Sequence, residues 1–366
     1  MMNYRKRIER LLEDLAGYEA EAILISQPKN RSYLSGFDGS AGYLLITAED
    51  RVLATDFRYL EQAKRQSPDY RVFPISGLRE EWIPELLHGH NIRFLAFESR
   101  NITFYHYREL SDIIKKSGLG IGLVPVDGIV EEIRKIKEPG EIELVTSAVA
   151  ISDAAMEYAR GLIASHITEQ ELGWEIERFI REAGSEPVPF GIIVGSGENA
   201  ALPHCRAASR DISSGGPVLL DFGARVGGYS SDLSRTFIVG GGDETFKRVY
   251  DIVLGAQLAA IEMVKEGMTG EEADNIARTV ITEAGYGEYF GHALGHGIGL
   301  LPHEAPRLGS GSKEKIREGM VFTIEPGIYI PGWGGVRIED TVVMDGGRVR
   351  VISKAEKIGV DDVKCR

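Results

Sequence analysis

Three of the chain's eight histidines lie in one short, glycine-rich segment. Residues 291–304 read GHALGHGIGLLPHE and contain His292, His296 and His303. Near neutral pH, an imidazole can bind a metal ion, transfer a proton or donate a hydrogen bond to a developing oxyanion. We therefore expect this segment to line a reaction centre, with one histidine available as a metal ligand and the others for proton transfer or oxyanion binding.

Two common motifs do not fit this segment. His292 and His296 have the spacing of a zinc-protease helix, but that motif requires a glutamate directly after its first histidine, where this chain has Ala293. The glycines at positions 291, 295, 297 and 299 also disfavour a helix. A phosphate-binding loop would require a following Lys and Ser/Thr, which the segment lacks. The glycines indicate instead that the backbone closely approaches a crowded centre.

Two predicted hairpins supply four carboxylates. Asp221 and Asp232 belong to the first hairpin, and Glu325 and Glu339 belong to the second. Each pair falls on one face of its hairpin, so we expect all four side chains to point toward one place. A buried carboxylate costs several kcal/mol unless a cation or a proton neutralises it. The set therefore predicts a bound cation.

The turn of each hairpin determines how its carboxylates face each other. A loop at Val226-Gly227 makes the two aspartates direct cross-strand partners, whereas a loop at Gly227-Gly228 makes them diagonal partners. A longer loop centred on Gly332 places the two glutamates opposite each other. Both carboxylates of a hairpin share one face in all of these arrangements.

Nearby arginines offer an alternative to metal. Arg225, Arg235 and Arg337 could neutralise the carboxylates in ordinary ion pairs. Four carboxylates on matching hairpins need more positive charge than three arginines supply, and we prefer the metal interpretation. Oxygen-rich ligands with a minority of imidazole suit Mn, Co, Fe or Zn in a site that can hold two ions.

The elements that would position these groups occur twice. Residues 167–184 match residues 268–285 at a constant offset of 101, and each copy has a threonine start signal, a helical pattern and a glycine stop. The tripeptide ending at His204 likewise matches the one ending at His303, and the first hairpin matches the second. We infer one compact domain built from two copies that pack about a pseudo-twofold axis.

The remainder of the chain predicts a second, different domain. Residues 1–128 alternate short strand patterns with helical patterns, which indicates an α/β domain. Residues 129–366 would form the duplicated domain, and its first part contains a break at Pro139-Gly140 before a long amphipathic helix.

The composition limits the cellular compartments and the classes of binding partner that we expect. Cys205 and Cys365 have no paired spacing, which fits a reducing compartment. With 42 basic and 55 acidic residues the net charge is −13, which disfavours nucleic acid and anionic membranes as partners. No apolar run approaches the ~20 residues of a membrane span, so we expect a cytoplasmic protein.

Together these motifs resemble the "pita-bread" metallopeptidases, which include aminopeptidase P, prolidase and methionine aminopeptidase. The resemblance covers the whole chain and rests on RSYLSGF and TDFRYLEQA in the first domain and DFGARVGGYSSDLSRTF, HALGHGIGLLPHE, TIEPGIYI and GVRIEDT in the second. Methionine aminopeptidase fits less well because it lacks the first domain. The fold implied is an α/β N-terminal domain followed by an α+β pita-bread catalytic domain with internal pseudo-twofold duplication.

The resemblance also implies roles for the residues. Two divalent metal ions per subunit, Mn, Co or Zn, would be held by Asp221, Asp232, His296, Glu325 and Glu339. Glu325 would take a proton from the attacking water. The other catalytic residues would be His204, His292, His303 and Arg337, and the three histidines among them would also bind substrate.

The implied reaction is hydrolysis of Xaa-Pro bonds. Prolidase-like members often have an arginine at the position of Arg307 that can bind the carboxylate of a C-terminal proline, which favours a dipeptidase over an aminopeptidase P acting on longer peptides. A non-catalytic peptide-binding protein is the alternative from another class, and the intact ligand set argues against it. We also expect a homodimer in which Arg58 or Tyr59 approaches the neighbouring subunit's site.

Overall fold

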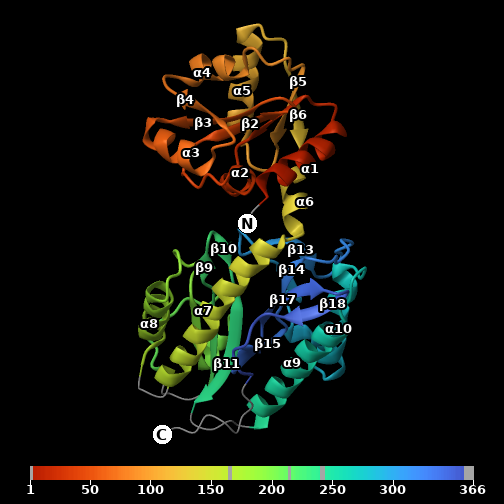
Figure 1. Cartoon of the computed structure of the whole chain (residues 1–366). Helices are drawn as coiled ribbons and strands as arrows, with labels where there is room; N and C mark the ends of the chain where they lie inside the picture. The colour runs from red at the N-terminus through yellow and green to blue at the C-terminus, as the bar shows by residue number, and fades with distance from the viewer. Residues whose placement is uncertain (1–2, 164–166, 213–215, 240–243, 358–366) are drawn as a thin grey trace. The chain divides into compact units, whose positions relative to one another are not determined.

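The chain forms two compact units, Met1–Arg134 and Lys135–Arg366. The computed structural model describes residues 3–163, 167–212, 216–239 and 244–357 (Figure 1). Cys365 lies outside the described residues. The first unit ends at Arg134, six residues beyond the boundary that the sequence predicts after residue 128. Among the described residues, no helix is long and apolar enough to cross a membrane.

The first unit is built on a six-stranded sheet of order β4-β3-β2-β1-β5-β6. Its strands are β1 (Ala22–Ile25), β2 (Tyr43–Thr47), β3 (Arg51–Asp56), β4 (Arg71–Ile75), β5 (Phe94–Glu98) and β6 (Gly122–Val126). Its helices are α1 (Tyr4–Ala16), α2 (Pro28–Ser35), a 3-10 turn (Phe57–Tyr59), α3 (Leu60–Gln66), α4 (Arg79–Leu87) and α5 (Phe104–Ser117), and α6 (Ile129–Lys135) leads into the second unit. The predicted α/β organisation is confirmed.

The second unit contains two helix pairs and two main sheets. The helices are α7 (Pro139–Ile163), α8 (Glu169–Glu182), α9 (Glu244–Met263) and α10 (Gly270–Glu283), with 3-10 turns at Gly197–Ala201 and Gly287–Tyr289. One sheet, of order β11-β8-β7, consists of β7 (Ile193–Ser196), β8 (Gly216–Phe222) and β11 (Leu233–Val239). The other, of order β13-β12-β14-β17-β18, consists of β12 (Gly295–Gly297), β13 (Glu304–Leu308), β14 (Val321–Ile324), β17 (Asp340–Asp345) and β18 (Arg348–Val351).

The duplication predicted from the sequence appears as matching helices. Both α8 and α10 begin with a capping box, in which Thr168 pairs with Glu171 and Thr269 with Glu272. Each helix buries one stripe of apolar residues at four-residue spacing, Leu172, Ile176 and Ile180 in α8 and Ala273, Ala277 and Ile281 in α10. Helix α8 packs on α7 and α10 packs on α9, one pair in each half of the unit (Figure 1).

The first hairpin has the second of its two predicted registers. Asp221 pairs with Ser234 across β8 and β11, so Asp232 is its diagonal neighbour. Gly227 and Gly228, between β9 (Arg225–Val226) and β10 (Tyr229–Ser230), have φ angles of 56° and 82°. Positive φ at both central residues is the signature of a type I′ turn, whose twist matches that of the flanking strands.

The second hairpin turns where the sequence predicts. Gly327 pairs with Arg337 between β15 (Gly327–Ile330) and β16 (Gly334–Arg337), a register centred on Gly332, whose φ is 76°. The same register continues into the pairing of β14 with β17, where Ile324 faces Asp340. Glu325 and Glu339 therefore lie at the junctions between the two parts of one long hairpin.

Candidate metal centre

One cavity of about 740 Å³ in the second unit brings together the predicted site residues. All ten line it, namely Asp221, Asp232, Glu325, Glu339, His204, His292, His296, His303, Arg307 and Arg337. The four carboxylates occupy strand ends, since Asp221 is near the end of β8, Asp232 precedes β11, Glu325 follows β14 and Glu339 precedes β17. Both hairpins thus direct their carboxylates to the same place, as the sequence predicts.

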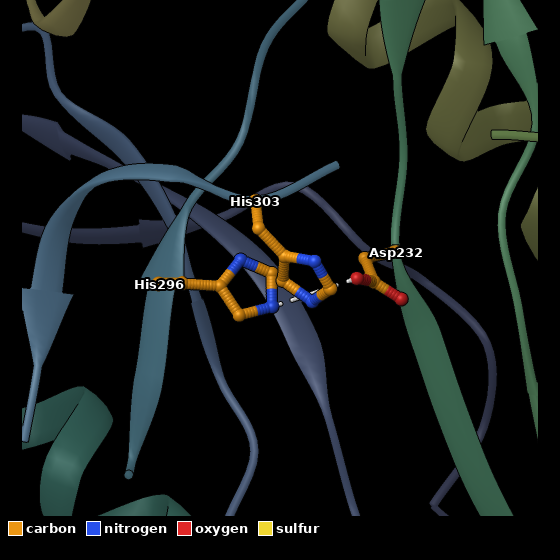
Figure 2. Close-up of side chains that lie close together, drawn as sticks. All are labelled: Asp232, His296 and His303. Carbon is orange, nitrogen blue, oxygen red and sulfur yellow. Dashed lines mark ion pairs between the residues drawn. The ribbon is translucent and has the colours of Figure 1, made fainter. Parts of the chain in front are cut away.

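Three overlapping groups of these side chains have metal-binding geometry. They are Asp232, His296 and His303; His296, Glu325 and Glu339; and Asp221, Asp232 and Glu339, and within each group the candidate ligand atoms lie within 4.8 Å of one another. Figure 2 shows the rings of His296 and His303 beside each other, with the Asp232 carboxylate opposite them. His296 Nε2 is 3.7 Å from Asp232 Oδ2 and 3.2 Å from Glu325 Oε1.

Burial gives this cluster an unusual charge state without metal. Asp232 and Glu339 are 5% and 1% exposed. Burial first, and then the charges of the neighbouring carboxylates, raise the pKa of Asp232 and of Glu339 well above their ordinary values. Without metal, these two carboxyl groups therefore keep their protons to a higher pH than ordinary carboxyl groups do, and a cation would replace those protons.

Glu325 and His296 form the oppositely charged part of the cluster. Burial alone would raise the pKa of Glu325, but the hydrogen bond and charge of His296 lower it to about 2. Burial opposes the charged form of His296, and the same bond to Glu325 raises the pKa of the imidazole nonetheless. Glu325 is therefore ionised at neutral pH in the metal-free cluster.

The arginines do not neutralise the four carboxylates as ordinary ion pairs would. Among the described residues, Arg337 is the one arginine within ion-pair distance of them, and it bonds to Asp221. Arg235 instead pairs with Asp340 at 2.8 Å. The other carboxylate oxygen of Asp221, Oδ1, is buried without a hydrogen-bond partner. A buried, unpaired acceptor in a cluster with excess negative charge fits a cation site.

Tyr329 contacts two residues of the site without lining the cavity itself, and it was not among the site residues predicted from the sequence. Its hydroxyl accepts a hydrogen bond from Arg337 Nη1 at 2.8 Å and lies 2.9 Å from His292 Nε2. Burial raises the pKa of Tyr329 to about 12, so the phenol keeps its proton. The alternation of a strand could have located it, because residues 325, 327 and 329 fall on one face.

These contacts determine the tautomer of His292. Its Nδ1 lies 2.8 Å from the carbonyl oxygen of Ala293, which can only accept, so Nδ1 has the proton. Nε2 then accepts from the Tyr329 hydroxyl. Burial lowers the pKa of His292 and keeps the ring neutral. In this state His292 is better suited to receive a proton than to donate one to an oxyanion.

The remaining predicted residues lie on the open side of the cavity. The His303 ring centroid is 4.2 Å from that of His296, and burial followed by the charge of His296 lowers the pKa of His303. Arg307 is exposed and donates one hydrogen bond to the Ser310 carbonyl at 2.9 Å. The glycines of the histidine segment permit this packing, since a Cβ on Gly295 would lie 2.0 Å from the Thr323 carbonyl oxygen.

Comparison with known proteins identifies a family for each part of the chain. Residues 7–136 match the creatinase/prolidase N-terminal domain, and residues 143–345 match metallopeptidase family M24. The Xaa-Pro dipeptidase of Pyrococcus horikoshii is 37% identical over 354 residues, which cover 96% of this chain and 98% of that protein.

Solved structures show the same fold. A structure of the Xaa-Pro dipeptidase from Bacillus anthracis matches with a TM-score of 0.94 and 40% identity, over 98% of this chain and 99% of that one. The X-Pro aminopeptidase from Thermotoga maritima matches with a TM-score of 0.87 and 34% identity, over 94% and 99%. With its pita-bread catalytic domain and its creatinase/prolidase N-terminal domain, the chain belongs to metallopeptidase family M24.

Proposed function

We propose that this chain is a metal-dependent dipeptidase that hydrolyses Xaa-Pro dipeptides. The observation that supports this most strongly is the complete set of predicted ligands, which meet in one cavity with ligand atoms at metal-binding separations. The names of the relatives support the substrate class, because proteins 37% and 40% identical over nearly the full length are Xaa-Pro dipeptidases. Retention of all five ligands argues against a non-catalytic binding protein.

Asp221, Asp232, His296, Glu325 and Glu339 would hold two divalent ions, with Mn, Co or Zn as our prediction. Such ions lower the pKa of a bound water and polarise a carbonyl oxygen when they are present. Glu325 would accept the proton of the attacking water.

The other groups would control protons and orientation. His303, at the edge of the cluster, would donate to the oxygen of the scissile carbonyl. Neutral His292, beside Tyr329, would receive a proton released from the attacking water and pass it on toward the leaving nitrogen. His204 lines the same cavity and would contact the substrate. Arg337 would keep Asp221 and Tyr329 in place through the bonds that it donates to both.

Arg307 supports the dipeptidase over the aminopeptidase. It lines the cavity and is exposed, and one of its hydrogen bonds is used by Ser310, so much of the guanidinium is open to a substrate carboxylate. The X-Pro aminopeptidase from Thermotoga maritima, 34% identical, is the reason to keep the second candidate. Cleavage of Ala-Pro and Ala-Pro-Ala should be compared, and a rate on the tripeptide equal to that on the dipeptide would favour an aminopeptidase P.

The proposal also includes the oligomeric state and the cellular location of the protein. We propose a homodimer in which the segment near Arg58 and Tyr59 meets the neighbouring subunit, and Phe57, 83% exposed beside them, is available for such a contact. Sedimentation at working concentration tests this directly, and a monomeric mass would contradict it. A cytoplasmic location remains our prediction from the scarcity of cysteine.

A further inference from the structure

A buried ion pair lies behind the wall of the cavity that contains His303. Lys137 Nζ is 3.0 Å from Glu304 Oε1, and the two side chains are 1% and 9% exposed. Glu304 lines the cavity, whereas Lys137 does not. Neither residue belongs to the ligand set or to the groups proposed to contact substrate.

Glu304 is placed where its position determines that of His303. It is the first residue of β13 and directly follows His303. Strand β13 pairs with β12, with Arg307 opposite His296 and Glu304 opposite Gly297, and the register shifts between these two pairs. Where the register of a strand shifts, backbone hydrogen bonds hold the strand in place less firmly than in a regular ladder. A side-chain contact there contributes more to the position of the backbone.

The Glu304 carboxylate fills a space that exists because residue 299 is a glycine. A Cβ on Gly299 would lie 2.2 Å from Glu304 Oε1 and 3.2 Å from Lys137 Cε, so Gly299 leaves the space that the pair fills. The backbone of Lys137 is also fixed, because its N–H donates to the Gly319 carbonyl at 2.9 Å and Ile136 bridges to Met320. The lysine is thus anchored to the segment that leads into β14, the strand that ends before Glu325.

Loss of either charge would disturb this arrangement. Without the ammonium, the largely buried Glu304 carboxylate would lose the positive charge of Lys137. A buried carboxylate that loses such a charge tends to rotate toward water or to take up a proton. Either response changes the start of β13 and the backbone that bears His303. Displacements of ~1 Å at a catalytic group can lower rates by up to ~10²-fold.

We propose that Lys137, acting through Glu304, is a positioning residue for His303. The inference rests on the proposed peptidase function, in which His303 contacts the reacting carbonyl. Since Lys137 directly follows the segment that leaves the first unit, the pair also fixes the start of the catalytic domain to the wall of its active site.

The test is a double-mutant cycle on Ala-Pro hydrolysis by the full-length, Mn²⁺-loaded protein. Lys137→Met and Glu304→Gln should each lower kcat by about tenfold to a hundredfold with little change in KM. The double variant should be no worse than either single variant, because it contains neither charge of the pair. Lys135→Met is the matched control, because Lys135 pairs with Glu314, neither residue lines the cavity, and kcat should stay within twofold.

A readout independent of activity separates this inference from the function itself. In metal-free protein at one pH, the ¹H–¹³C signal of the His303 ring, assigned with His303→Gln, should move in Lys137→Met and not in Lys135→Met. If the wild type is inactive but this signal moves, the proposed function fails and the positioning role stands. Unchanged kcat with an unmoved His303 signal, or losses that add in the double variant, would overturn the inference. If Lys137→Met does not fold, kcat and the His303 signal of the near-isosteric Glu304→Gln test the inference with the same expected results.

Discussion

At the scale of single residues, the site contains four carboxyl groups that lie too close together for all of them to be ionised without a bound cation. Asp221, Asp232, Glu325 and Glu339 converge, while Arg337 and His296 supply the nearby positive charge. In the metal-free protein, the raised pKa values of Asp232 and Glu339 favour their protonated forms, which relieves the repulsion. A divalent ion does the same without protons, so metal and protons compete for the same oxygens.

This competition predicts a pH dependence with a definite sign. Because the folded pKa values of Asp232 and Glu339 are raised, the folded metal-free protein binds more protons than the unfolded chain above the ordinary carboxyl pKa, and these groups make it less stable as pH rises. Metal binding must release those protons, so Mn²⁺ affinity should increase from pH 5.5 toward neutrality. Calorimetric titration in two buffers of different ionisation enthalpy measures the release, and an affinity independent of pH would contradict the assignment.

The hydroxyl of Tyr329 provides a second test. Tyr329→Phe keeps the buried ring but leaves Arg337 Nη1 and His292 Nε2 without this partner. We expect kcat for Ala-Pro to fall about tenfold or more, within the range for groups that transfer protons, with a small change in KM. Tyr286→Phe is the control, because the Tyr286 ring packs near Tyr289 and, unlike that of Tyr329, contacts neither His292 nor Arg337. Equal kcat for Tyr329→Phe and wild type would remove Tyr329 from the mechanism.

Substitution of Arg307 tests whether this side chain recognises the C-terminal carboxylate of a dipeptide. Arg307→Met should raise KM for Ala-Pro by about tenfold or more, because a charge-assisted bond to the proline carboxylate is lost, and should leave kcat nearly unchanged. The amide Ala-Pro-NH₂ has no such carboxylate, so its KM should be the same in both proteins. Equal KM shifts for the acid and the amide would mean that Arg307 acts on packing and does not recognise charge.

At the scale of elements, the hairpins show what sequence can and cannot predict. The carboxylate spacing and the adjacent glycines limited the first hairpin to two registers, and the structure has the one that turns at Gly227-Gly228. The edge strands β4 and β6 are hard to recognise from sequence, because Pro74 and Pro125 interrupt their patterns, and their edge positions tolerate proline. The bonds of Tyr329 and the ion pair of Lys137 depend on tertiary packing that local patterns do not encode.

The first turn can be tested through stability. Gly228→Ala places a side chain at a φ of 82° and within 3.3 Å of Leu300, and should lower the free energy of unfolding by ~1–2 kcal/mol. Gly255→Ala is the matched control, because Gly255 lies inside helix α9 with open space around its Cβ position, and should stabilise by ~0.5–1 kcal/mol. Urea unfolding of metal-free protein measures both. Equal effects of the two substitutions would contradict the turn assignment.

At the scale of the whole molecule, the catalytic unit is a duplicated scaffold around one charged cavity. Each copy contributes a capped helix, an apolar stripe and a hairpin that ends in carboxylates. The sequence was sufficient to predict this organisation, because helix caps and apolar stripes repeat at a constant offset. The ligands lie on both copies, so neither copy forms the site alone, and metal should stabilise the unit as a whole.

The most direct measurement is proline release from Ala-Pro by chelator-stripped protein as Mn²⁺ is added in known equivalents. We predict no activity without metal, activity that rises with added Mn²⁺ until two ions per chain are bound, and a parallel rise in Tm. Asp232→Asn should lose both the activity and the rise in Tm. Full activity in the stripped protein, or saturation of metal binding without any cleavage of Ala-Pro, would contradict the proposal of a dinuclear Xaa-Pro dipeptidase.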